Sequence, residues 1–333
     1  MKKIANYIIC MLLLALSGML DSCFKENPIK VPAANYSGQV SVAGMGANYT
    51  KQIYFNIRTG QYVSENSKYD YDMSFDCTPS SYYVWVNGSK LMLVCRTGKT
   101  ALNGVSLADT AAGWRVEYGA GDLTNNAIGN WGYPTSTGDV YLLNLGEDSN
   151  GVNLGYKKMQ MGNYVGGSYT VTFCNIDGSD LHTVSVPKKP NRNQVYLSFK
   201  DQQVHDFEPD YENWDFIFTQ YSVYFVDQHL PYKVTGVLTN PHRTMAYFMD
   251  SVSDFNKITK DSVHQSKFGT LRDGVGYTWK HYEYGEYTTL IKHIYIIRSY
   301  DNSIADYRYY KLHFLDFYNA GTKGYPKFEY AEL

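Results

Sequence analysis

A pattern of short alternating segments that occurs twice is the feature that most constrains the fold of this chain. Gln52–Ile57 matches Gln194–Phe199, and Tyr71–Phe75 matches Trp214–Phe218. Apolar and polar side chains alternate in both copies, as they do in strands with one buried face. Helical periodicity is nearly absent. The pattern therefore predicts an all-β protein.

The two copies continue further along the chain. Val140–Leu143 matches Ile294–Ile297, and Tyr156–Met159 matches Tyr310–His313, with one shared offset of 154 residues. Repetition at a fixed offset indicates duplicated structural units. We predict two tandem homologous β-rich domains, residues 35–186 and 187–333. The boundary falls at Pro187–Asn191, a proline-rich and charged stretch that suits neither helix nor strand.

Composition narrows the classes of function. The net charge is −2 and no basic run occurs, which excludes an electrostatic nucleic-acid surface. The chain contains 33 tyrosines, whose flat apolar rings and polar tips suit both paired strands and surfaces that bind flat ligands or sugars. No nucleophile elbow, phosphate-binding loop, zinc-protease or dinucleotide motif is present. We therefore expect a non-enzymatic protein.

The N-terminus has the layout of a lipoprotein signal. Lys2 and Lys3 precede an apolar run from about residue 8 to residue 16, and Leu20 and Ser22 precede Cys23 as in a bacterial lipobox. The run is shorter than the roughly 20 residues that span a bilayer. We predict a signal peptide over 1–22, lipidation at Cys23 and a tether over 23–34. An ordinary secretory signal with an incidental cysteine is the alternative.

The remaining cysteines are Cys77, Cys95 and Cys174, and no CxxC or Cys/His cluster suggests zinc. Cys77 and Cys95 flank a possible hairpin and could pair in an oxidising compartment.

Lys25 and Glu26, which follow closely after the lipidated cysteine, weakly resemble signals for export to the outer face of the outer membrane. We therefore expect a lipid-anchored protein of the outer membrane at the cell surface.

Several segments of the second half resemble one family of surface lipoproteins. The resemblance is carried by the opening strands 194–199 and 213–218, the segment Thr235–Asn240, the closing strands 294–298 and 310–317, and the C-terminal hairpin 321–330. Together they resemble the HmuY-like haem-binding lipoproteins (haemophores) over most of residues 183–333. The first half resembles the family more weakly and is expected to be a degenerate copy.

The resemblance implies a right-hand-like all-β fold that grips haem between loops at one end. It also implies two axial side chains on the iron, His/His or Met/Met. The family takes haem from host haemoproteins for iron acquisition and passes it to a TonB-dependent outer-membrane receptor. Haem is therefore the expected cofactor, and haem binding the expected function.

The candidate iron ligands follow from this resemblance. His281 lies 13 residues before Ile294, where the family has its second axial ligand. The other ligand is expected in the preceding loop region, where Met245, Met249 and His242 are candidates. A thioether favours reduced haem iron, whereas imidazoles suit the oxidised form. A surface histidine and core-filling methionines are the alternative interpretation of these residues.

Two further functions remain open from the sequence. A structural or adhesive subunit of a fimbrial type would also be a β-rich lipoprotein and would polymerise by exchanging strands. A glycan-binding protein would use the tyrosine-rich surface instead. Haem binding, polymerisation and glycan affinity each distinguish one hypothesis from the others.

Overall fold

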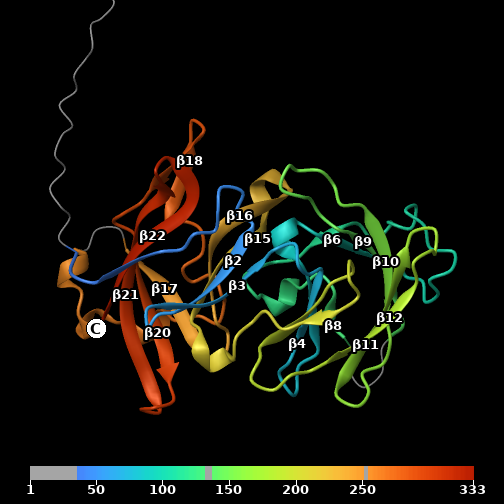
Figure 1. The fold of residues 1–333 in the computed structure, drawn as a ribbon, viewed down its shortest axis with the longest axis horizontal. Coiled ribbons are helices and arrows are strands. Elements are labelled where there is room, and N and C mark those ends of the chain that lie inside the picture. Colours follow the sequence, from blue (N-terminus) through green and yellow to red (C-terminus); the bar gives the residue numbers. More distant parts are fainter. Residues whose placement is uncertain (1–35, 132–136, 251–253) are drawn as a thin grey trace, which may run out of the picture. The chain divides into compact units, whose positions relative to one another are not determined.

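The alternating segments of the sequence form β-strands in the computed structural model, which describes residues 36–131, 137–250 and 254–333 (Figure 1). The predicted signal, Cys23 and the tether lie outside the described residues. Residues 37–333 form one compact unit. Its strands pair antiparallel, and the helical segments are short 3-10 turns. The predicted all-β class is confirmed.

Two sheets with a common core form a first lobe, the described part of residues 69–207. One sheet has the order β12-β11-β10-β9-β6-β7 and the other the order β14-β13-β4-β5-β8. Met73, Phe75, Leu143, Val171 and Leu197 are fully buried between them. The strands are β4 (Met73–Asp76), β5 (Tyr83–Val86), β6 (Leu93–Arg96), β7 (Arg115–Val116), β8 (Gly129–Asn130), β9 (Val140–Asn144), β10 (Tyr156–Met161), β11 (Ser168–Asn175), β12 (His182–Pro187), β13 (Gln194–Leu197) and β14 (Val204–His205), with 3-10 turns η1 (Gly88–Lys90) and η2 (Leu123–Asn125).

A second lobe combines residues 37–68 with the described part of 208–333. Its sheets have the orders β1-β22-β21-β20-β17 and β16-β15-β2-β3, and β18 pairs with β19. Phe55, Phe216, Phe218, Leu312 and Phe328 lie in its core. The elements are β1 (Gln39–Val42), β2 (Lys51–Asn56), β3 (Gln61–Ser67), η3 (Tyr211–Asn213), β15 (Phe216–Phe225), η4 (Val226–Gln228), β16 (Leu230–Thr239), β17 (Thr244–Asp250), η5 (Phe255–Lys257), η6 (Lys260–Ser262), η7 (Gln265–Lys267), β18 (Lys280–Glu283), β19 (Glu286–Thr289), β20 (Ile294–Asp301), β21 (Asp306–Asn319) and β22 (Thr322–Glu332).

Strand pairing crosses the boundary that the sequence predicts at 187–191. β13 and β14 follow that boundary in the chain but pair within the first lobe, while β1 pairs with β22 and β2 with β15 in the second lobe. Two tandem domains and a HmuY-like architecture are not confirmed. The first lobe is one continuous stretch of chain, and the second is assembled from both ends of the described chain.

Both lobes nevertheless repeat one strand register. In the second lobe Tyr54 of β2 is opposite Ile217 of β15, and in the first lobe Tyr196 of β13 is opposite Ser74 of β4. The flanking pairs follow in the same order in both sheets. Successive side chains of a strand point to opposite faces of its sheet. One face of each sheet therefore packs into the core of its own lobe, and the opposite face is turned toward the other lobe.

The repeat also corrects the last sequence match by one residue. The sequence pairs Lys157 with Lys311, but the buried counterpart of Lys311 is Lys158. Lys158 is opposite Leu142 on β9, and Lys311 is opposite Ile296 on β20. In both lobes a buried lysine occupies this position of the strand pair and donates a hydrogen bond to a backbone carbonyl. The structural repeat therefore aligns Lys158 with Lys311.

The possible disulfide between Cys77 and Cys95 does not form. Both cysteines are buried and free, as is Cys174. Cys77 follows β4, and its Sγ accepts a hydrogen bond from the amide of Lys189, whereas Cys95 lies on β6 in the other sheet of the lobe. The two thiols are therefore held in different sheets.

Candidate functional site

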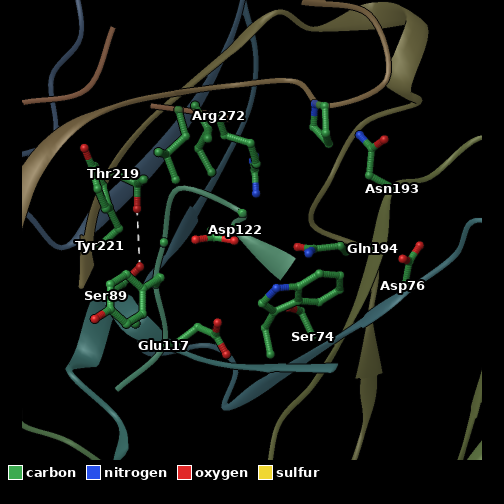
Figure 2. A pocket seen from close by; sticks show the side chains of 18 of the residues that line it. Ser74, Asp76, Ser89, Glu117, Asp122, Asn193, Gln194, Thr219, Tyr221 and Arg272 are labelled. Carbon is green, nitrogen blue, oxygen red and sulfur yellow. Dashed lines mark hydrogen bonds between the residues drawn. The ribbon is translucent and has the colours of Figure 1, made fainter. Parts of the chain in front are cut away.

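A cavity of about 690 Å³ lies between the sheet β14-β13-β4-β5-β8 of the first lobe and the sheet β16-β15-β2-β3 of the second lobe (Figure 2). Alternate residues of the repeated strands line it: Gln52 and Tyr54 of β2, Ser74 and Asp76 of β4, Gln194 and Tyr196 of β13, and Ile217, Thr219 and Tyr221 of β15. Its volume is in the range of small-molecule sites, about 300–1,000 Å³. The cavity is therefore built jointly by both lobes.

Aromatic side chains form repeated walls in this cavity. Tyr54 meets Trp214 edge-on at 5.1 Å between ring centroids, and Tyr196 meets Tyr71 edge-on at 4.8 Å. The hydroxyls of Tyr54 and Tyr196, which occupy matching positions in the two lobes, are 3.3 Å apart. A contact between equivalent residues is what an approximate two-fold relation produces. The cavity thus lies at the meeting point of the two repeats.

A polar network joins the lobes at one side of the cavity. The Gln52 amide donates to the hydroxyl of Thr219 at 2.7 Å and to that of Ser89 at 3.0 Å. Ser89 in turn donates to the backbone oxygen of Gln220 at 2.7 Å. These buried bonds fix the side chains before any ligand binds, because each donor already has its acceptor.

Three other buried polar atoms that belong to lining residues have no hydrogen-bond partner among the described residues. They are Oε1 of Glu117, Nε1 of Trp214 and the hydroxyl of Tyr221. All three residues are buried. A buried polar atom without a partner costs roughly 1–3 kcal/mol. All three atoms are enclosed by surrounding protein atoms rather than open to the cavity.

Burial also changes the protonation of the lining groups. Desolvation raises the pKa of Glu117 to about 8, so its carboxyl is mostly uncharged and can donate a proton to a hydrogen bond at neutral pH. Beneath Tyr196, burial raises the pKa of Glu208 to about 7, against hydrogen bonds from Asn193 that lower it. The carboxyl-bearing lining residues, Asp76, Glu117 and Asp122, all come from the first lobe.

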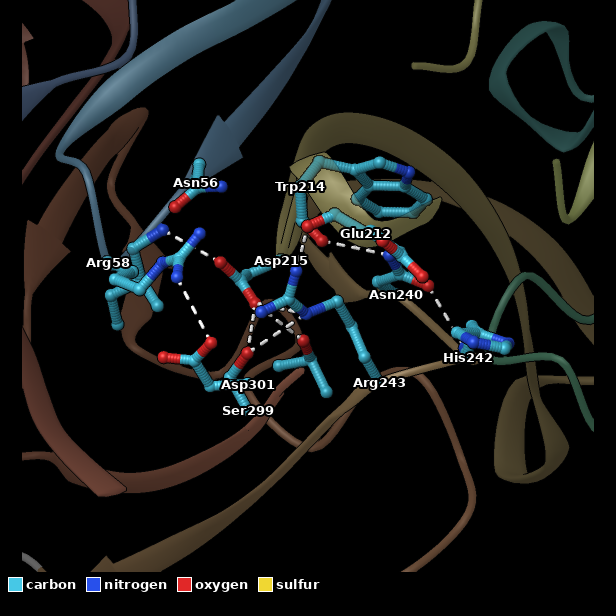
Figure 3. Close-up of polar contacts among 12 residues, drawn as sticks. Asn56, Arg58, Glu212, Trp214, Asp215, Asn240, His242, Arg243, Ser299 and Asp301 are labelled. Atoms are coloured by element: carbon cyan, nitrogen blue, oxygen red, sulfur yellow. Dashed lines mark hydrogen bonds and ion pairs between the residues drawn. The ribbon is translucent and has the colours of Figure 1, made fainter. Parts of the chain in front are cut away.

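A buried carboxylate, that of Asp215, anchors strands of the second lobe beside Trp214 (Figure 3). Asp215 accepts hydrogen bonds from the amide of Ile57 and the hydroxyl of Thr244, both at 2.9 Å, and from the hydroxyl of Ser299. The Nε of Arg243 is 3.4 Å from Asp215 Oδ1. Asp215 therefore joins β2, β17 and β20 at one buried point.

The first lobe has the same anchor. Asp72 accepts a hydrogen bond from the amide of Phe199 at 2.6 Å and forms an ion pair with the buried Lys90. Asp215 directly precedes β15 and bonds an amide just past the end of β2, and Asp72 directly precedes β4 and bonds an amide just past the end of β13. Each aspartate also lies beside one buried cation. These anchors set the position of the aromatic residues one position before them, Tyr71 and Trp214.

One of the four predicted haem ligands lines the cavity. His242 lies at its rim, with its imidazole stacked on Tyr211 at 3.7 Å between ring centroids. Partial burial lowers its pKa, so the ring is neutral at physiological pH. Its backbone amide donates to Asn240, which fixes the turn that carries it.

The other three predicted ligands lie elsewhere. His281, on the β18–β19 hairpin, is opposite Thr288 and 62% of its side chain is exposed. Met245 on β17 accepts a hydrogen bond at its sulfur from Arg298, and Met249 packs half-buried in a satellite cluster of the second lobe. Among the described residues, no hydrogen bond or ion pair joins His281 to either methionine or to His242.

Sequence reasoning missed most of the lining residues. The repeat already contained Gln52, Tyr54, Gln194 and Tyr196, and their identity in both copies was the available signal. Glu117 and Arg272 come from loops without a repeated pattern, and no sequence signal marks them.

Comparisons with known proteins give no relative. No family model, no curated protein and no solved structure matches this chain. Within the described ranges, no group of three or more His, Cys, Asp or Glu side chains is arranged to hold a metal ion. No helical segment of the described residues is long and apolar enough to cross a membrane.

Proposed function

We propose that this protein is a non-enzymatic binding protein that captures a saccharide in the cavity between its lobes. The observation that carries the proposal is that aromatic rings and polar side chains line one cavity. Sugar rings present apolar C–H faces, which pack on aromatic rings, and hydroxyls, which need directed hydrogen bonds. Tyrosine and tryptophan rings together with Gln, Ser and Thr side chains of the lining supply both kinds of group.

The test uses a variant that removes one unpartnered atom and nothing else. Tyr221→Phe deletes the hydroxyl of this lining residue and keeps the ring. Binding of the preferred oligosaccharide, identified on a glycan array and quantified by calorimetry, is expected to weaken about fivefold to tenfold. Stability is expected to stay equal or to rise, because an unsatisfied buried group is lost.

The matched control is Tyr310→Phe, whose hydroxyl is also buried without a partner but does not line the cavity. Its affinity for the same oligosaccharide should equal that of the wild type. Equal affinities for both variants and the wild type, or no glycan bound at all, would reject the proposal.

Haem capture is the second candidate, and His242 is the observation that favours it. A neutral imidazole at the rim of an aromatic cavity provides one axial donor. Titration of the protein with haemin would then give a saturable Soret shift that His242→Ala removes and His281→Ala leaves intact. The reverse result would favour the hairpin histidine, and no shift in either redox state would exclude haem.

The proposal includes a lipid anchor at Cys23 that holds the protein on the outer membrane. Metabolic labelling with an alkyne fatty acid is expected to mark the wild type and to leave Cys23→Ala unmarked. Protease accessibility on intact cells then tests surface exposure. An unlabelled wild type would favour the ordinary secretory signal.

A further inference from the structure

Arg272 is the one lysine or arginine that lines the cavity in the described part of the chain. Its backbone is fixed on both sides. The Arg272 amide donates to the carbonyl of Ala120 in the first lobe at 2.7 Å, and its carbonyl accepts from the amide of Thr239 at 2.7 Å. Its side-chain Nε donates back to the Thr239 carbonyl at 3.0 Å. The guanidinium is therefore positioned before a ligand arrives.

A glycine permits this position. A Cβ added at Gly121 would lie 3.0 Å from Cδ of Arg272, and Gly121 has a φ of +77°. The aliphatic stem of Arg272 thus packs directly on the backbone of the first-lobe loop. Both lobes contribute to holding the arginine at the cavity (Figure 2).

Among the described residues Arg272 forms no direct ion pair, and its charge acts through space on the buried Glu208, whose pKa it lowers. No carboxylate of the described residues lies within ion-pair distance of Arg272, and its Nη atoms donate no hydrogen bond to them. The two cavity aspartates already accept hydrogen bonds: Asp76 accepts from the amide of Thr78 at 2.7 Å, and Asp122 accepts from the amide of Thr124 at 2.9 Å. The buried Glu117 is mostly uncharged at neutral pH.

We infer that the saccharide is an acidic one, in which a sugar carboxylate of the uronic-acid type pairs with Arg272. The inference rests on the proposed saccharide function and names the class of sugar. A planar guanidinium with both Nη groups free matches the two oxygens of a carboxylate.

The experiment compares oligosaccharides that differ only in the carboxylate. Fragments of polygalacturonate, alginate and hyaluronan are arrayed beside their carboxyl-reduced forms and beside neutral glucans and galactans. At least one acidic fragment is expected to bind tenfold or more tightly than its reduced form, and the difference should shrink as salt rises.

Three variants assign that preference to Arg272. Arg272→Gln is expected to abolish it, while Arg272→Lys, which keeps the charge but loses the planar fork, should retain part of it. Lys200→Gln removes the same charge from an exposed position outside the cavity and should behave as wild type. Thermal unfolding of each variant checks that the fold is kept.

The outcomes separate the two proposals. Equal binding of acidic and reduced fragments, or an acidic preference that survives Arg272→Gln, would overturn the role of Arg272 while saccharide binding stands. Failure to bind any fragment, acidic or neutral, would overturn the saccharide function itself and this inference with it.

Discussion

Asp215 and Arg243 form a buried pair on which the second lobe depends. Asp215 is fully buried, and Arg243 is 8% exposed. In Asp215→Asn the amide keeps the size of the carboxylate but leaves the arginine charge without a counter-charge. Breaking one partner of a buried pair typically costs about 3–5 kcal/mol. We expect a loss of that size in the free energy of unfolding, measured by urea titration.

The control for this prediction is Asp227→Asn, which removes the same charge at an exposed position. Its stability should stay within about 0.5 kcal/mol of the wild type. A loss at Asp215→Asn no larger than that of Asp227→Asn would show that Asp215 is not a structural anchor.

Glu117 makes stability depend on pH. Burial raises its pKa from 4.5 to about 8, so between these values the folded protein binds a proton that the unfolded chain has released. Stability therefore falls as pH rises through this window, by an amount on the order of a few kcal/mol. Below pH 4.5 both states are protonated, and the penalty vanishes.

The variant Glu117→Gln cannot ionise and should lose this dependence. Urea unfolding at pH 5 and pH 8 is expected to show the variant gaining stability relative to the wild type at the higher pH. Glu208 is present in both proteins and cancels in the difference. A stability difference that does not change with pH would contradict the prediction.

The loop that carries Glu117 approaches β15 closely at Gly119. A Cβ added there would lie 2.7 Å from the Cβ and Cδ2 atoms of Tyr221. Gly119→Ala is therefore expected to push the loop and the tyrosine apart, with a loss of about 1–3 kcal/mol of stability and weaker saccharide binding. Urea titration and calorimetry measure the two effects.

Gly269→Ala provides the comparison, since a Cβ at Gly269 would meet nothing within 4 Å. Its stability and affinity should match those of the wild type. An unchanged Gly119→Ala would mean that the loop adjusts without moving Tyr221.

The strands themselves were predictable because their side chains alternate. The segments 294–297 and 310–313 lie within β20 and β21, and 140–143 lies within β9. Their partners were not predictable, because alternation sets which face of a strand is buried but not which strand lies beside it. β2 resembles β13 closely, and the sequence alone does not show that each pairs with a strand from the other predicted domain.

The site was less predictable than the strands. Tyr54 and Tyr196 stood out only as repeated residues, and their meeting depends on how the two lobes pack. Glu117, Asp122 and Arg272 come from irregular loops whose positions follow from long-range contacts such as the bond between Arg272 and Ala120. A single sequence carries no local signal for such contacts.

The division into lobes predicts which fragment folds alone. Residues 69–207 keep the strand partners of both first-lobe sheets, whereas 35–186 separates β1 and β2 from β22 and β15. We expect the fragment 69–207 to unfold cooperatively in urea and 35–186 to show no cooperative transition. Near-ultraviolet circular dichroism gives an independent measure of packed aromatic side chains.

A cooperative transition for 35–186 and none for 69–207 would place the boundary at 187, as the duplicated sequence predicts. Cooperative folding of both would show that β1 to β3 can find partners in either half.

The pairing of β1 with β22 sets an order of events on the ribosome. Gln39 and Tyr330 are 291 residues apart in the chain, yet they are hydrogen-bonded in one sheet. The first lobe has all its strands once residue 207 has emerged, so it can form while synthesis continues. β1 can pair only after β22, the last strand, has been synthesised. A chain released before that strand leaves β1 as an unpaired edge, which proteases and chaperones can bind.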